Sequence, residues 1–143
     1  MLSKTRLISA EDTLAIRQVV LWPDMPIEHV QLAEDPDGIH LGLFVASGSD
    51  HTEKLVGVAS FFPQGKTARL RKMAILPEMQ GQGWGSRLLR EAIEHLAARG
   101  ISAVWCDVRR SAAGFYQTLD FGISRDVFIK NGIEYLKAQK SLI

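Results

Sequence analysis

Three glycines, Gly81, Gly83 and Gly85, alternate just before a stretch whose apolar residues recur at helical spacing. Glycines at the start of a helix leave backbone N–H groups open to an anion, and the helix dipole adds about half a positive charge at that end. This segment therefore predicts a phosphate-binding turn. The alternative is that the glycines only shape a tight connection between a strand and a helix.

Two known phosphate-binding patterns match this turn only in part. Gly81-x-Gly83 begins a dinucleotide fingerprint, and Asp107 stands roughly where its ribose-binding acid would follow. Ser86 replaces the third glycine of that fingerprint, however, and no second strand–helix–strand half follows Asp107. A Walker loop is excluded because no Gly-Lys-Ser/Thr sequence follows the glycines. We therefore do not expect a nicotinamide site or a nucleoside triphosphate site.

A third pattern matches more of the segment. Gln80 precedes Gly83 by three residues and Gly85 by five, and residues 73–77 come shortly before it in the chain. This spacing resembles the Gln/Arg-x-x-Gly-x-Gly/Ala acyl-CoA motif of the GNAT superfamily of N-acetyltransferases. A second motif of that superfamily is matched by Ala112, Phe115, Tyr116 and Phe121. Two residues depart from it: Arg109 stands where asparagine is usual, which puts a customary cofactor contact in question, and Asp120 stands where glycine is usual, which predicts a different turn.

The resemblance implies an α/β fold: a GNAT-like mixed, mostly antiparallel twisted sheet with helices on both faces and one central βαβ unit. Residues 1–143 would form a single domain. Acetyl-CoA would bind along the first motif and donate its acetyl group to a primary amine of a small molecule or an amino-acid-like acceptor. The implied cofactor contacts are Met73, Ala74, Ile75, Gln80, Gly81, Gln82, Gly83, Trp84, Gly85 and Ser86. The alternative is a non-catalytic acyl-CoA-binding sensor or interaction module.

The resemblance also assigns a catalytic role to Tyr116, whose position in the family carries a phenol that hydrogen-bonds the leaving sulfur. The alternative is a core aromatic beside Phe115. Asp107 is a candidate general base, because it follows a predicted strand that leads toward the cleft. Glu28 and His29 are weaker candidates, in a loop that could cover the acceptor. For all three, a solvated surface position is the competing interpretation.

Two arginines and the cysteine are further candidates for the site. Arg69 and Arg71 share one face of a predicted strand, so either could bind an acceptor carboxylate or be paired with neighbouring acids. Cys106 lies in an apolar run, which favours a buried small side chain over a nucleophile.

The pattern of elements agrees with such a fold. A short strand near residues 6–8 precedes a helix capped by Ser9 that ends near Leu21. Strands are expected at 39–46, 55–62 and 67–76, with a polar loop at 47–54, and the clearest helix begins at Trp84 and stops at Gly100. A strand at 103–106, a helix capped by Ser111 that runs to Leu119, and a hairpin of 127–130 with 133–136 around Asn131-Gly132 complete the pattern.

Composition narrows the class of protein. The chain has 143 residues, a formal net charge of +1 and a single cysteine. The near-neutral charge argues against nucleic acid or an anionic membrane as a partner, and the single cysteine excludes an intrachain disulfide. No Cys/His cluster has metal-ligand spacing, and no apolar run is long enough for a signal core or a membrane span. We expect a cytoplasmic enzyme without a metal, and exposed terminal strands make a homodimer an expectation.

Overall fold

Four antiparallel strands form the N-terminal half of the sheet, in the order β1-β2-β3-β4. The structure is a computed structural model that describes residues 2–46, 48 and 52–143. The strands are β1 (Leu2–Ile8), β2 (Ile39–Ala46), β3 (Glu53–Gln64) and β4 (Thr67–Ile75). Helix α1 (Ala10–Leu21) follows β1. Ser9 caps it as predicted, because its hydroxyl accepts from the Asp12 N–H while the Asp12 carboxylate accepts from the Ser9 N–H.

The C-terminal half adds strands beyond β4 in the order β5-β8-β6, with β7 also paired to β8. Its elements are α2 (Trp84–Ala98), β5 (Ala103–Arg109), α3 (Ala113–Gln117), β6 (Gly122–Ile123), β7 (Phe128–Lys130) and β8 (Ile133–Ser141). β4 and β5 are parallel and α2 connects them, so the predicted βαβ unit is confirmed. The other strand pairs are antiparallel, which confirms the expected mixed, mostly antiparallel sheet.

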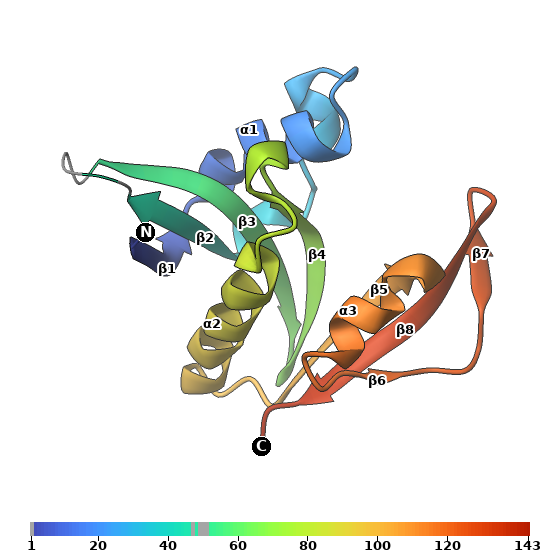
Figure 1. Ribbon diagram of the computed structural model, residues 1–143. Helices are drawn as coiled ribbons and strands as arrows, with labels where there is room; N and C mark the ends of the chain where they lie inside the picture. Colours follow the sequence, from blue (N-terminus) through green and yellow to red (C-terminus); the bar gives the residue numbers. More distant parts are fainter. Residues whose placement is uncertain (1, 47, 49–51) are drawn as a thin grey trace.

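Helices cover both faces of the sheet, as expected (Figure 1). Helix α1 lies on one face, where Ile16 packs with Val58 and Ala74. Helix α2 lies on the other face and buries the stripe that the sequence predicts: Leu88, Leu89, Ala92 and Leu96. Burial of that stripe fixes α2, and thereby the glycine turn at its N-terminus, against β3 and β4.

Short 3-10 turns complete the connections: η1 (Ile27–Val30), η2 (Asp35–Asp37), η3 (Pro77–Met79) and η4 (Arg110–Ala112). The segment between α1 and β2, predicted as a loop with a short helix, contains η1 and η2. Figure 1 shows this segment standing above the sheet, across a gap from the β7–β8 hairpin.

Several predicted boundaries are wrong. Ser111 does not cap a helix to Leu119; it lies within η4, and α3 is a shorter helix without a side-chain cap. β3 continues through Pro63, and β5 and β8 extend well beyond their predicted ends. Pairing with a neighbouring strand keeps these residues extended even where the sequence no longer shows a run of apolar residues. Of the predicted loop at 47–54, residues 47 and 49–51 lie outside the described residues, and Glu53 and Lys54 pair within β3.

Asp120 adopts a φ of 66°, the left-handed conformation that glycine favours. Aspartate is one of the few side chains that tolerate this conformation, because its short carboxylate can bond locally. Replacement of the usual glycine therefore does not by itself require a different turn before β6. The Asn131-Gly132 turn is confirmed, with both residues at positive φ (52° and 77°) between β7 and β8.

Candidate active site

The sheet opens between its two halves. β4 pairs with β5 only where Thr67–Arg69 faces Ala103–Trp105, and the two strands then diverge. On its other edge, β4 stays paired to β3 as far as Ile75, but two β4 residues, Lys72 and Met73, face the single residue Ala59. This is a β-bulge, and Lys72 within it has a φ of 55°. The bulge bends β4, and beyond it the β4 backbone has no strand partner on the β5 side among the described residues.

A cleft of about 540 Å³ follows the opened edge of β4 to the start of α2. Eight of the ten predicted cofactor contacts line it: Met73, Ala74, Ile75, Gln80, Gly81, Gly83, Gly85 and Ser86. The structure thus brings together a strand edge and a helix N-terminus, the two features that the sequence placed next to each other. The volume is within the usual range for a small-molecule site.

The glycine turn presents its backbone to this cleft. Gly81 and Gly83 have φ values of 74° and 87°, and a Cβ at either position would meet no described atom within 4 Å. Gly83 is the N-cap of α2 and makes no side-chain capping bond, so the first N–H groups of the helix are open to a ligand. The Gln80 side chain donates from Nε2 to the carbonyl of Ile75 at 2.8 Å, which ties the turn to the end of β4.

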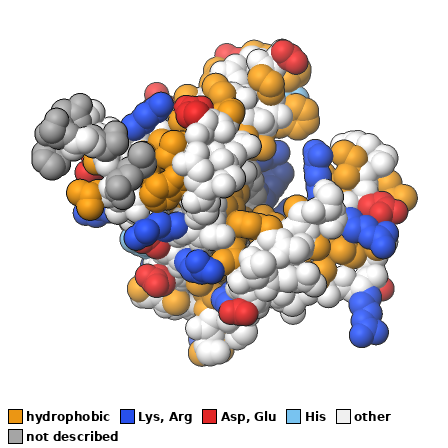
Figure 2. Space-filling view, viewed as in Figure 1, with side chains coloured by type: hydrophobic (Ala, Val, Ile, Leu, Met, Phe, Trp, Pro, Cys, Tyr) orange, Lys and Arg blue, Asp and Glu red, His pale blue; other side chains and the backbone are white. Residues whose placement is uncertain are grey.

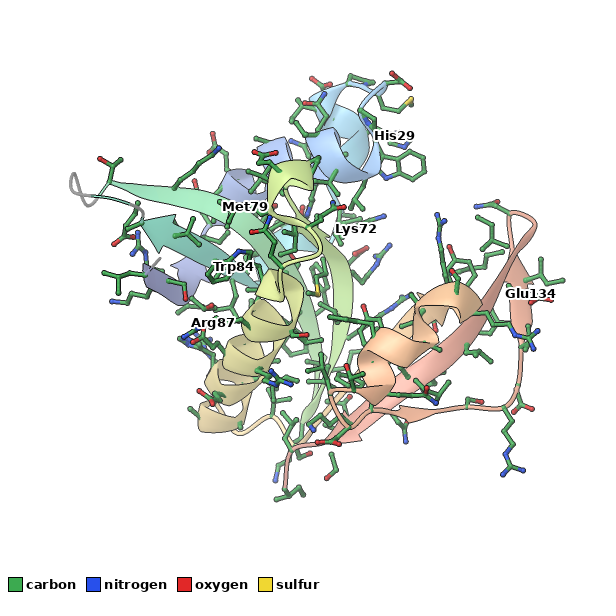
Figure 3. All side chains as sticks on the ribbon, in the orientation of Figure 1. His29, Lys72, Met79, Trp84, Arg87 and Glu134 are labelled. Atoms are coloured by element: carbon green, nitrogen blue, oxygen red, sulfur yellow. The ribbon has the colours of Figure 1, made fainter. Side chains whose placement is uncertain are left out.

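Gln82 and Trp84 lie elsewhere. They line a separate hollow with Arg87 and Arg90, and the Gln82 amide donates to the carbonyl of Glu78 at 2.9 Å. Figure 3 shows Trp84 and Arg87 on the side of α2 away from α3. The Trp84 side chain also packs against the core. Neither side chain lines the cleft, so any part these two residues take in cofactor binding belongs to their backbone.

Tyr116 is the first candidate catalytic side chain. It lines the cleft, as Met73 does, and its ring makes edge contacts with Phe115 and Phe121 at centroid distances of 5.1 and 5.5 Å. No residue in the described part of the chain is hydrogen-bonded to its hydroxyl. Burial, with a smaller contribution from Cys106, raises the pKa of the Tyr116 phenol well above its usual value. The phenol is therefore a hydrogen-bond donor that stays protonated.

A second pocket, of about 530 Å³, lies on the other side of Tyr116. Met73, Ala112 and Tyr116 line both cavities, so the two meet at these residues. Its remaining walls come from the end of α1, the bulged part of β4, β5 and the β7–β8 hairpin: Leu21, Trp22, Arg69, Leu70, Arg71, Lys72, Cys106, Asp107, Val108, Arg109, Lys130 and Tyr135. Figure 2 shows blue side chains in the hollow between the η1 segment and that hairpin.

Asp107, the candidate base, lines this second pocket and is paired with cations. Its Oδ2 lies 3.0 Å from Arg69 Nη2 and 3.6 Å from Lys130 Nζ. Arg71 Nη1 is bonded to Glu34 Oε2 at 3.1 Å. Both arginines are therefore paired with acids, the alternative that the sequence left open.

The remaining candidates lie outside the pocket or are buried. Glu28 and His29 are exposed on η1, and neither lines the pocket, although His29 contacts the Trp22 ring at 4.9 Å. Cys106 is buried as predicted, and burial, together with Asp107, raises the pKa of its thiol to about 12, which rules out a thiolate nucleophile. Over the described ranges, no group of three His, Cys, Asp or Glu side chains could hold a metal ion, and no helix is long and apolar enough to cross a membrane.

Sequence reasoning missed several residues that line the two cavities. Val20, Met79 and Phe115 line the cleft, and Lys72, Lys130 and Tyr135 line the second pocket. Phe115 carried a signal in the second motif. No sequence signal marked Lys72, because its placement depends on the bulge. The placement of Lys130 depends on how β8 pairs with both β5 and β7.

The strand edge, the glycine turn and Tyr116 lie within a segment that matches a known family. Residues 10–121 match the model of the acetyltransferase (GNAT) family. The chain belongs to this family. The uncharacterized N-acetyltransferase YitI of Bacillus subtilis is 36% identical over 125 residues, which cover 81% of this chain and 80% of that protein.

Solved structures show the same fold. An acetyltransferase from Bacillus subtilis in complex with CoA has a TM-score of 0.73 at 16% identity, covering 99% of this chain and 100% of that one. The ribosomal-protein-S18-alanine N-acetyltransferase of Escherichia coli has a TM-score of 0.72 at 19% identity, covering 99% and 94%. The expected GNAT fold is therefore confirmed, and the protein is an acetyltransferase that uses acetyl-CoA.

Proposed function

We propose that this chain, as a single domain, transfers the acetyl group of acetyl-CoA to a primary amine of a small molecule or an amino-acid-like acceptor. The observation that supports the proposal best is that two cavities meet at Tyr116: one runs along an unpaired strand edge to a glycine turn, and the other opens beside it. A donor in the first cavity and an amine in the second would face each other there.

The backbone of the first cavity suits the donor. The diphosphate of CoA would accept from N–H groups between Gly81 and Ser86, where the helix dipole adds attraction. The pantetheine arm would pair with the free edge of β4 at Met73–Ile75 as an added strand does. A backbone N–H of this segment would then polarise the acetyl carbonyl and stabilise the oxyanion of the tetrahedral intermediate.

In the reaction, the neutral amine attacks the carbonyl carbon, an N–C bond forms, and the C–S bond breaks with its electron pair on sulfur. Tyr116 lines both cavities, and its hydroxyl would donate a hydrogen bond to that sulfur. Full proton transfer from Tyr116 would be uphill, because burial raises the phenol pKa and a thiol titrates near 8.5. Its contribution is therefore a hydrogen bond to the developing thiolate.

Asp107 is our proposed acceptor of the amine proton, directly or through a water. It is the one carboxylate among the residues that line the second pocket. Arg69 and Lys130 hold its position. A bound amine can replace the longer contact to Lys130 without disturbing the bond from Arg69. The cytoplasmic location and the homodimer expected from the sequence stay predictions.

Release of CoA thiol in the presence of amines tests the function. Purified protein is incubated with acetyl-CoA and separate amines, amino acids, polyamines and peptide N-termini, and the acetylated product is identified by mass spectrometry. We expect amine-dependent thiol release and a mass increase of one acetyl group. Tight acetyl-CoA binding without turnover for every amine would instead support the sensor role.

A further inference from the structure

The second pocket is strongly cationic. Five of its lining side chains carry a positive charge, namely Arg69, Arg71, Lys72, Arg109 and Lys130, against the single carboxylate of Asp107. The whole chain, by contrast, has a formal net charge of only +1. The cations are thus gathered at this site, and they come from separate elements, β4, β5 and the β7–β8 hairpin.

Three of these cations have acidic partners, whereas Lys72 and Arg109 have none in the described part of the chain; Arg109 is exposed to solvent, and Lys72 is half-buried. Arg69 and Lys130 share Asp107, and Arg71 is bonded to Glu34. Within residues 2–46, 48 and 52–143, no acid lies within ion-pair distance of Lys72. Burial, followed by Arg71 and the other nearby cations, lowers the pKa of its ammonium. A half-buried ammonium among like charges is electrostatically costly, and a bound anion would remove that cost.

Lys72 lines this pocket from a strained backbone position. Its φ of 55° lies in the left-handed region, which costs a non-glycine residue about 1–2 kcal/mol. Lys72 lies in the bulge and is followed by Met73, one of the residues at which the two cavities meet. Figure 3 shows Lys72 on the side of β4 that faces α3 and β8. Lys72 therefore stands beside the place where the amine must react.

We propose that the acceptor amine carries an anionic group, a carboxylate or a phosphate, and that Lys72 binds that group. This inference rests on the proposed function, because it takes the second pocket as the acceptor site. The glycine turn lies on the far side of Tyr116, so the phosphates of CoA are bound elsewhere and leave these cations free. The same charges repel polyamines.

Matched pairs of amines test the inference. β-Alanine is compared with n-propylamine, and O-phosphoethanolamine with ethanolamine, by thiol release and by calorimetry on protein saturated with CoA. In at least one pair, we expect kcat/KM to be at least about tenfold higher for the anionic amine than for its neutral partner, as expected for a hydrogen bond to a charged group. Where no turnover occurs, the same difference is expected in affinity. The two pairs distinguish a carboxylate from a phosphate.

Two variants of Lys72 and one control sharpen the test. Lys72→Met should remove most of the preference for the anionic amine and change the neutral amine by less than about threefold. Lys72→Arg should keep the preference because it keeps the charge. Lys66→Met removes an exposed charge from the β3–β4 turn, outside the pocket. This control should change neither the preference for the anionic amine nor the activity toward the neutral amine.

Two kinds of result would overturn the inference. One is acetylation of neutral amines at least as fast as their anionic partners, which would leave the proposed function standing. The other is weaker CoA binding in Lys72→Met with an unchanged acceptor preference, which would assign Lys72 to the cofactor. If no amine is bound or acetylated while acetyl-CoA still binds, the proposed function fails together with the inference.

Discussion

Arg17 on α1 and Asp35 on η2 form a bidentate ion pair. Arg17 Nη1 and Nη2 donate to the two carboxylate oxygens at 2.8 and 3.0 Å, and the Arg17 side chain is fully buried. Arg17 also donates to Ser60 Oγ and to the carbonyl of Val30. The pair links α1, η2 and β3, and Glu34, the residue before Asp35, bonds to Arg71 in the pocket wall.

Asp35→Asn should strongly destabilise the protein. The substitution leaves the buried guanidinium of Arg17 without its counter-charge, which costs about 3–5 kcal/mol in comparable buried pairs. The free energy of unfolding, measured by chemical denaturation, gives the loss. Glu134→Gln is the matched control, because it removes one acid from the exposed pair with Arg110 and should cost less than about 1 kcal/mol. Equal losses in the two variants would contradict the account.

The same pair predicts how stability changes in acid. Burial opposes ionisation of Asp35, but the bonds from Arg17 and the Leu32 N–H outweigh it and hold the pKa of the carboxyl below its usual value. Such a group contributes its full stabilisation above the unfolded-state pKa, about 3.9, and loses it as pH falls through the folded-state value. Below about pH 4, wild type should therefore lose more stability than Asp35→Asn. Parallel curves of unfolding free energy against pH would argue that Asp35 does not titrate this way.

Gly83→Ala should weaken acetyl-CoA binding beyond its effect on stability. Alanine at a φ of 87° strains the turn, and its methyl group stands where the diphosphate would approach the backbone. Gly65→Ala is the control, because Gly65 also has a positive φ of 61° and open space around its Cβ position, but lies in the β3–β4 turn. Both variants should lose about 1–2 kcal/mol of stability. Calorimetry should show about tenfold weaker binding or worse in Gly83→Ala alone.

Tyr116→Phe should separate chemistry from binding. Loss of a hydrogen bond to the developing thiolate should lower kcat by about tenfold to a hundredfold. The dissociation constant of acetyl-CoA should change by less than about twofold, because the phenyl ring keeps its contacts with Phe115 and Phe121. Unchanged turnover in this variant would remove Tyr116 from the mechanism.

Cys106 should be unreactive in the folded protein. The residue is only 3% exposed, and burial raises the pKa of its thiol to about 12, so almost no thiolate is present at pH 8. Iodoacetamide should label it slowly in native protein and rapidly in denaturant, as followed by mass spectrometry. Rapid labelling of native protein with loss of activity would indicate an open, reactive thiol instead.

The sequence predicts well what depends on neighbouring residues. The glycine turn, the stripe on α2 and the Asn131-Gly132 hairpin are set by local spacing, and the structure has each of them. Lys72 could not be foreseen, because its direction depends on a bulge that only the pairing of β3 with β4 creates. Burial of Arg17 could not be foreseen either, because its partners come from a loop and a distant strand.

The crystal structure of the complex with CoA tests the central claim most directly. We predict the diphosphate on the N–H groups between Gly81 and Ser86, the pantetheine arm along Met73–Ile75, and the sulfur within about 3.5 Å of the Tyr116 hydroxyl. CoA bound at another surface, or a cleft left empty at saturating CoA, would contradict it.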